Sequence, residues 1–282
     1  MSECINAYAK INIFFEIKRK RSDGYHEIDS LMQTVSIHDK VYIKKRNDSR
    51  IKLEMDKNIV PKEKNIAVKI IKYYNDYFSL SEGYDIKIEK NIPVGAGLGG
   101  SSADGAAVLR GLEKINNFSF NDKFIKSVSE LGADIPFLYR KGLARVGGIG
   151  EKIDMLPYKF KDYLLIGYPN KLISSRWAYK NSNFLLTDKR KDSSILLRCL
   201  KRRDFECVYQ NLFNRFEQLV FDKYPQVKQL KEDFIKYGAS AASMSGSGSS
   251  VFAVYDSRTK ALEAMKELQS SWYWLELAEF EY

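Results

Sequence analysis

The sequence is poor in cysteine and histidine and has no long apolar run. Only three cysteines and two histidines occur among 282 residues. The cysteines (Cys4, Cys199 and Cys207) are widely spaced and form no CxxC pair, so we expect neither a disulfide framework nor a Cys/His zinc site. Within the longest uncharged run, residues 238–255 are half Ser and Gly, and the run is therefore too polar to replace the roughly 20 apolar residues that span a bilayer.

The N-terminus lacks the pattern of a secretion signal. Glu3 and Lys10 lie where a signal peptide has a basic start followed by an apolar core. The composition, 44% hydrophobic and 29% charged, is typical of a globular protein that buries a core. We therefore predict a cytoplasmic protein without a membrane partner.

Acidic residues are fewer than basic ones, 36 against 46, and the formal charge is +10. Such an excess is compatible with a nucleotide, an anionic membrane or a nucleic acid as partner. The basic residues form short, separate clusters with acids nearby, which favours a solvated surface and argues against a nucleic-acid partner. A basic nucleic-acid-binding protein without catalysis, suggested by this charge and by 13% aromatic residues, remains the alternative from another class.

The N-terminal segment has the clearest periodicity in the chain. Residues 5–17 are apolar at every second position, which predicts a half-buried strand. Lys10 and Asn12 are two residues apart and must therefore leave the same face of that strand.

Strand and helix patterns mix along the rest of the chain without strict alternation. A strand pattern over residues 27–43 has an expected break at His38-Asp39, and residues 239–250 read as a Gly/Ser-rich loop. This mixture predicts an α+β protein in two lobes rather than a doubly wound sheet. We place the boundary near Pro157, with lobes at 1–156 and 157–282.

A Gly-rich segment, residues 93–103, directly precedes a helical pattern. Four glycines within six residues (95–100) let the backbone turn tightly and expose its N–H groups. Ser101 and Ser102 lie where the helix would start, and a helix N-terminus binds anions. The segment is not a Walker A loop, since no Gly-Lys-Ser/Thr closes it, and no acidic residue follows where a Rossmann site needs one. It therefore predicts a phosphate cradle.

Three further segments are weak signals when taken singly. Residues 245–250, Ser-Gly-Ser-Gly-Ser-Ser, run directly into an apolar strand pattern and are expected to face the first Gly-rich loop. Residues 132–137 hold Asp134 after a glycine, and residues 23–26 read Asp-Gly-Tyr-His. A lone Asp in a turn or a His at a hairpin is ordinarily structural.

The order of these segments is specific. Ala-Tyr-Ala-Lys-Ile-Asn at 7–12, then residues 23–26, 93–100, 132–136 and 245–248, closely resembles the GHMP kinase superfamily over nearly the whole chain. The resemblance implies a lobe like domain 2 of ribosomal protein S5, followed by a ferredoxin-like lobe. It also implies an enzyme that transfers phosphate from ATP to an alcohol.

The same resemblance implies roles for individual residues. Lys10 and Asp134 would be the catalytic pair, with Asp134 accepting the proton of the substrate hydroxyl and Lys10 neutralising charge. Mg²⁺ is expected to accompany ATP; its ligands stay open, with Ser102 as one candidate. The residues implied to bind ATP are Pro93, Val94, Gly95, Ala96, Gly97, Leu98, Gly99, Gly100, Ser101, Ser102 and Ala103. Because Ser101 stands where the family usually has a third glycine, the phosphate-contacting hydroxyl is either Ser101 or Ser102.

The Ala-Lys-Ile-Asn strand with Asp-Gly-Tyr-His, paired with Gly-Ala-Asp-Ile-Pro at 132–136, resembles one branch of this superfamily. That resemblance implies phosphorylation of a cytidine diphosphate alcohol in the non-mevalonate isoprenoid route. Asn12 would orient Lys10 or touch the substrate, and Tyr25 and His26 would hold the cytosine. We place the aromatic that closes the other side at Tyr179, with Trp177 as the second choice. A homoserine, mevalonate or sugar kinase is the nearest alternative, and a monomer or weak homodimer is expected.

Overall fold

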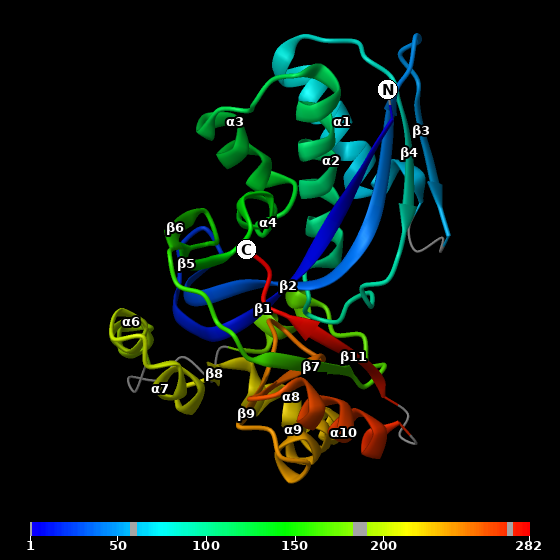
Figure 1. The fold of residues 1–282 in the computed structure, drawn as a ribbon. Coiled ribbons are helices and arrows are strands. Elements are labelled where there is room, and N and C mark those ends of the chain that lie inside the picture. Colours follow the sequence, from blue (N-terminus) through cyan, green and yellow to red (C-terminus); the bar gives the residue numbers. More distant parts are fainter. Residues whose placement is uncertain (1, 57–60, 183–190, 270–272) are drawn as a thin grey trace. The chain divides into compact units, whose positions relative to one another are not determined.

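The computed structural model describes residues 2–56, 61–182, 191–269 and 273–282, and these form two compact units (Figure 1). Unit 1 is drawn from residues 1–9, 37–92 and 99–140, and unit 2 from residues 10–36, 93–98 and 141–282. The strands β1 (Ser2–Lys20) and β2 (His26–Lys45) each pass from one unit to the other, as does the Gly-rich segment. The expected strand at residues 5–17 is confirmed as part of β1, but it is not half-buried, because residues 9–17 are buried on both faces.

Unit 1 joins one end of the larger sheet, to which β1 and β2 both belong, to a group of helices. The 40–45 end of β2 pairs antiparallel with β4 (Tyr84–Glu89), which pairs parallel with β3 (Ile51–Met55). Figure 1 shows α1 and α2 side by side next to these strands. The described helical elements of unit 1 are η1 (Lys62–Lys64), α1 (Ile66–Phe78), α2 (Gly100–Asn116), α3 (Asp122–Ser127), η2 (Val128–Glu130) and α4 (Ile135–Arg140).

The C-terminal part of unit 2 contains a four-stranded antiparallel sheet. Its order is β11-β7-β10-β9. Along the chain, a strand, a helical segment, two strands, a helix and a strand follow one another, which is the ferredoxin-like arrangement. The strands are β7 (Tyr163–Tyr168), β9 (Ala241–Met244), β10 (Val251–Tyr255) and β11 (Trp274–Glu279), and the helices that connect them include α8 (Phe216–Lys223), α9 (Pro225–Lys236) and α10 (Arg258–Leu268). The expected α+β class is therefore confirmed.

The rest of unit 2 adds strands to the 26–36 half of β2 and to the 10–20 half of β1, and contains further helices. Strand β5 (Leu143–Gly148) pairs antiparallel with β2 and with β6 (Lys152–Leu156), and β8 (Phe213–Asn214) pairs parallel with β1. The remaining described helices are α5 (Ser175–Lys180), α6 (Ser194–Lys201) and α7 (Phe205–Gln210).

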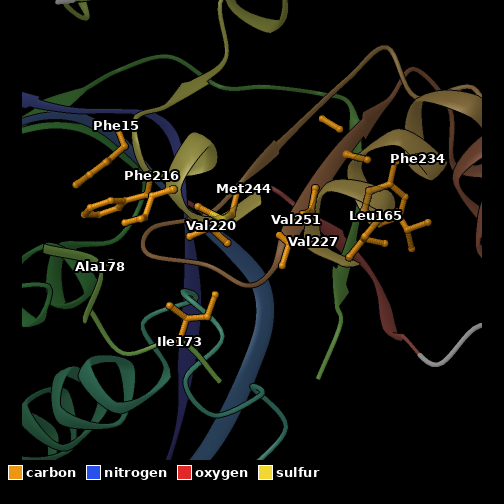
Figure 2. Close-up of a cluster of buried hydrophobic side chains, with 14 of the residues drawn as sticks. Phe15, Leu165, Ile173, Ala178, Phe216, Val220, Val227, Phe234, Met244 and Val251 are labelled. Carbon is orange, nitrogen blue, oxygen red and sulfur yellow. The ribbon is translucent and has the colours of Figure 1, made fainter. Parts of the chain in front are cut away.

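One hydrophobic cluster fills the interior of unit 2. Figure 2 shows Met244 beside Val220, with Phe15 and Phe216 on one side of them and Val251 on the other. Each of these five side chains is at most 4% exposed. The cluster therefore joins β1, α8, β9 and β10 into one rigid support for the loop that follows Met244.

Three sequence expectations about local structure are wrong. Strand β2 has no break at His38-Asp39, because the fully buried Asp39 carboxylate accepts the N–H groups of Asn91 and Ile92 and thereby satisfies its charge inside the sheet. The expected loop at 239–250 includes a strand, β9, because its apolar residues pair with β10.

The third concerns cysteine. Cys199 and Cys207, in the neighbouring helices α6 and α7, have Cα atoms 5.7 Å apart and form a disulfide. They are eight positions apart in sequence, and the turn between the two helices brings their side chains together. Cys4 is exposed and free.

None of the helices in the described part of the chain combines the length and apolar character that a membrane span requires. The lobe boundary at residues 156 and 157 stays a prediction.

Candidate active site

Lys10 and Asn12 form a buried polar pair on β1. Their side chains are 4% and 1% exposed, and the Lys10 Nζ donates to Asn12 Oδ1 at 2.5 Å. The Asn12 amide nitrogen in turn donates to Ser30 Oγ at 2.9 Å. The period-two prediction that the two residues share a face is therefore confirmed, and Asn12 holds the Lys10 ammonium in one position.

Both Gly/Ser loops approach this pair within unit 2. The backbone N–H of Lys10 donates to the carbonyl of Leu98 at 3.0 Å, and the N–H of Asn12 donates to Ser245 Oγ at 3.3 Å. Ser245 Oγ donates to the carbonyl of Gly97 at 3.0 Å. The prediction that the second loop faces the first is confirmed for residues 93–98.

Glycine is required where the loops meet. Gly97 has φ +80°, and a Cβ there would lie 2.2 Å from the carbonyl oxygen of Ser245. A side chain would therefore push the two loops apart, and the backbone carbonyls and N–H groups would lose their arrangement.

His26 and Tyr179 form a stacked pair in unit 2. Their ring centroids are 5.1 Å apart with an angle of 26° between the planes. The buried His26 Nε2 has no hydrogen-bond partner among the described residues. Burial, and then the charge of Lys20, lower the pKa of His26, so its imidazole is neutral at pH 7. A neutral ring with an unused nitrogen is suited to hydrogen-bond a heterocyclic base.

The structure separates the two second-lobe candidates for the aromatic contact. Tyr179 stacks on His26, whereas Trp177 packs edge-on against Tyr224 and lies under the Lys223 ammonium. Tyr25 precedes His26, and its side chain is 61% exposed. The geometry therefore brings Tyr179 to His26.

Unit 1 contains the second half of the Gly-rich segment and Asp134. Gly99 has a left-handed conformation and caps α2, so Ser101 and Ser102 lie in the first turn of that helix, as expected. A Cβ at Gly132 would lie 3.2 Å from Ser102 Oγ, so this hydroxyl faces the turn that carries Asp134. Ser101 is exposed. Asp134 immediately precedes α4, and its carbonyl accepts the N–H of Leu138.

A buried charge triad lies next to the start of α2. Lys90 donates to Asp104 at 2.7 Å and makes a shorter contact with Asp39. Burial would lower the pKa of Lys90, but the two carboxylates outweigh it and raise that pKa. Burial raises the pKa of Asp104 to about 7 against the opposing effect of Lys90. The triad ties α2 to β2 and to the segment after β4.

Asp104 makes the stability of the protein depend on pH. Because its pKa is about 7 in the folded state, against 3.8 ordinarily, the folded protein binds more protons than the unfolded chain between these values. The free energy of unfolding therefore falls as pH rises from about 4 to about 7. We expect the difference in free energy of unfolding between wild type and Asp104→Asn to change by up to about 4 kcal/mol across this pH window. Urea unfolding at several pH values measures it.

The matched control is Asp122→Asn, since the Asp122 side chain is 80% exposed. This variant should follow the wild-type pH curve. Parallel curves for wild type and Asp104→Asn would contradict a titrating Asp104.

Sequence reasoning missed several residues that support the site. Ser30 holds Asn12, and Lys90 and Asp39 anchor α2. Isolated polar residues within strand patterns were the only available signal for them, and it does not identify their partners. Among the described residues, no group of three His, Cys, Asp or Glu side chains could hold a metal ion.

Comparison with known proteins identifies the class to which this architecture belongs. Residues 65–142 match the family model described as GHMP kinases N terminal domain, and residues 196–273 match that described as GHMP kinases C terminal.

Individual relatives narrow this class. The chain is 35% identical to a 4-diphosphocytidyl-2-C-methyl-D-erythritol kinase of Acetivibrio thermocellus, over 95% of each chain. It is 37% identical to the kinase of the same name from Clostridium beijerinckii, over 95% of this chain and 96% of the relative. A crystal structure of 4-(cytidine 5'-diphospho)-2C-methyl-D-erythritol kinase matches with a TM-score of 0.80 at 25% identity, covering 99% of both chains. The chain therefore belongs to the GHMP kinases and, within them, to the 4-diphosphocytidyl-2-C-methyl-D-erythritol kinase family.

Proposed function

We propose that this protein transfers the γ-phosphate of ATP to the 2-hydroxyl of 4-diphosphocytidyl-2-C-methyl-D-erythritol, a step in the non-mevalonate synthesis of isoprenoid precursors. The proposal is carried by the arrangement around Lys10, whose strand is bonded to Leu98 of the first Gly/Ser loop and, through Asn12, to Ser245 of the second. A fixed lysine ammonium beside loops that expose backbone N–H groups can neutralise the charge of a phosphoryl group during its transfer. Such a reaction asks the protein mainly to position its reactants and to neutralise charge.

Each part of the site has a distinct task in this proposal. The Gly-rich segment and the start of α2 hold the ATP phosphates with backbone N–H groups and the positive end of the helix. Lys10 lies beside the γ-phosphate and stabilises the charge that spreads over its oxygens. Asp134 orients the 2-hydroxyl and accepts its proton as the oxygen–phosphorus bond forms. Asn12 holds Lys10 and orients the alcohol.

The proposed ATP site offers Mg²⁺ the oxygen ligands that this ion prefers. The ion prefers oxygen ligands and is usually held by phosphates with one or two protein groups, without a dedicated protein cage. The Ser102 hydroxyl, which faces the Gly132 turn, is the candidate protein group. When bound, Mg²⁺ would neutralise part of the phosphate charge.

The proposed cytosine site combines Tyr25, His26 at the start of β2, and α5. We assign the unpartnered His26 Nε2 to a hydrogen bond with the cytosine edge, with Tyr25 and Tyr179 supplying aromatic surface. Tyr25 belongs to the segment that distinguishes this branch from other GHMP kinases.

Tyr25→Ala should weaken binding of the cytidyl substrate. Loss of one base–aromatic stack costs roughly 1–3 kcal/mol, so the KM for this substrate should rise about 5- to 150-fold. The values of kcat and of the KM for ATP should change little. Tyr25→Phe keeps the ring and should retain the wild-type KM; an unchanged KM in Tyr25→Ala would contradict the cytosine role.

A single panel tests the proposed function. Turnover of ATP is measured with the diphosphocytidyl alcohol, with mevalonate and with homoserine, and retention on single-stranded RNA is measured at moderate salt. We expect turnover only with the cytidyl substrate. Turnover with mevalonate or homoserine instead would move the protein to another GHMP activity, and RNA retention without turnover would favour nucleic-acid binding. We also propose that the protein is cytoplasmic and that it is a monomer or a weak homodimer.

A further inference from the structure

Asn214 lies on β8, away from every motif of the sequence. It is 2% exposed, and β8 pairs with β1 in the register Phe15 to Asn214. The strand that carries Asn214 is therefore paired with the strand that carries Lys10 and Asn12.

All the hydrogen-bonding atoms of the Asn214 side chain are used on backbone groups. Its Nδ2 donates to the carbonyl of Met244 at 2.7 Å and to that of Gly246 at 2.8 Å, and its Oδ1 accepts the N–H of Phe216 at 3.0 Å. The two donated bonds bracket Ser245. Of the 20 amino acids, only Asn and Gln carry a side-chain amide that can make both kinds of bond, and Gln is one methylene longer.

The bracketed residue connects the two halves of the site. Ser245 Oγ accepts the N–H of Asn12 and donates to the carbonyl of Gly97. The next residue, Gly246, has φ +57°, and a Cβ there would lie 3.1 Å from Lys10 Nζ and 3.4 Å from Asn12 Oδ1. The loop backbone therefore forms one wall of the space that the Lys10 ammonium occupies.

Glu217 fixes the strand that enters this loop. Its Oε1 accepts the N–H of Met244 at 2.9 Å and the hydroxyl of Ser243 at 3.1 Å, and its Oε2 pairs with Lys231 at 2.7 Å. Glu217 therefore anchors β9 as far as Met244, whereas Asn214 bonds the loop that follows, at the carbonyl of Gly246.

We propose that Asn214 is a positioning residue for phosphoryl transfer: its amide holds the Ser245–Gly246 backbone in place, and that backbone fixes the position of the Lys10 ammonium. Asn214 touches neither substrate and acts through Lys10. The proposal rests on the function proposed above and adds to it the group that sets the geometry of its cation.

Asn214→Ser removes both donated bonds without introducing a charge. A misplaced catalytic group lowers turnover by up to about 100-fold, so we expect kcat to fall roughly 10- to 100-fold while both KM values stay within about twofold. The matched control is Asn75→Ser in unit 1, where the amide likewise bonds the backbone of one loop residue, Glu82. The control should keep the wild-type kcat.

A double-mutant cycle separates positioning from general structural support. If Asn214 acts through Lys10, Asn214→Ser should cause no further loss of kcat in a Lys10→Ala background, measured with radiolabelled ATP. Losses that multiply in the double variant would overturn the proposal, and so would an unchanged kcat in Asn214→Ser.

A readout without activity keeps this result distinct from failure of the proposed function. Hydrogen exchange of the Lys10 and Asn12 amides, which donate to Leu98 and Ser245, should accelerate at least tenfold in Asn214→Ser and stay at the wild-type rate in Asn75→Ser. Unchanged exchange would overturn the proposal even if the wild-type protein did not use the cytidyl substrate. Should Asn214→Ser fail to fold, Gly246→Ala displaces the same backbone, and it must then lower kcat with both KM values retained.

Discussion

Lys10→Ala should lower kcat roughly 100- to 1000-fold, the range found when one preorganised group that stabilises transition-state charge is removed. The Lys10 ammonium is nearly buried and bonded to Asn12, so it acts in surroundings where water does not screen it. Loss of this charge affects the transition state more than bound ATP, and the KM for ATP should therefore change less than kcat.

The measurement is steady-state turnover together with the thermal midpoint of unfolding. Lys52→Ala is the matched control because Lys52 is an exposed strand lysine in unit 1, and it should keep normal kinetics. A folded Lys10→Ala variant with near-normal turnover would remove Lys10 from the catalytic machinery.

Asp134→Asn should have a loss of similar size, about 100- to 10,000-fold in kcat, which is the usual contribution of a general base. Asparagine keeps the shape of the side chain but cannot accept the hydroxyl proton. Since Asp134 precedes α4 as a turn residue and its backbone carbonyl caps that helix start, the substitution leaves the backbone bond intact and the variant should fold.

Binding and turnover must be measured separately for this variant. Calorimetric affinities for ATP and for the cytidyl alcohol should remain within a few-fold of wild type, while single-turnover phosphate transfer becomes slow. The double variant with Lys10→Ala should lose less than the product of the two single losses, since the two residues would act on one transition state. Normal single-turnover transfer in Asp134→Asn would assign the proton to another group.

Local sequence patterns predict those features that depend only on residues close together in the chain. Alternating apolar residues predicted β1 and the shared face of Lys10 and Asn12, and dense glycines before a helical run predicted the loop that α2 follows. Asp39 shows the limit of such patterns. A charged residue ordinarily interrupts a strand, but here Lys90 and two backbone N–H groups, all more than 50 positions away in sequence, satisfy it.

Part of the basic excess of +10 has a specific place in the structure. Lys10 has a proposed role at the phosphates, and Lys90 and Arg215 neutralise buried carboxylates, those of Asp39 with Asp104 and that of Glu16. The other described clusters are surface residues, several of them in exposed ion pairs that contribute little to stability.

The sequence by itself determined the class of fold, the two Gly/Ser loops and the family, because these depend on residue types at short spacing and on their order along the chain. Only the tertiary structure decided that Tyr179 rather than Trp177 lies against His26, that Ser102 rather than Ser101 faces the Asp134 turn, and that Asn214 holds the second loop. Each of these depends on which side chains meet across large separations in sequence. Such meetings are set by the packing of whole elements, which no local pattern encodes.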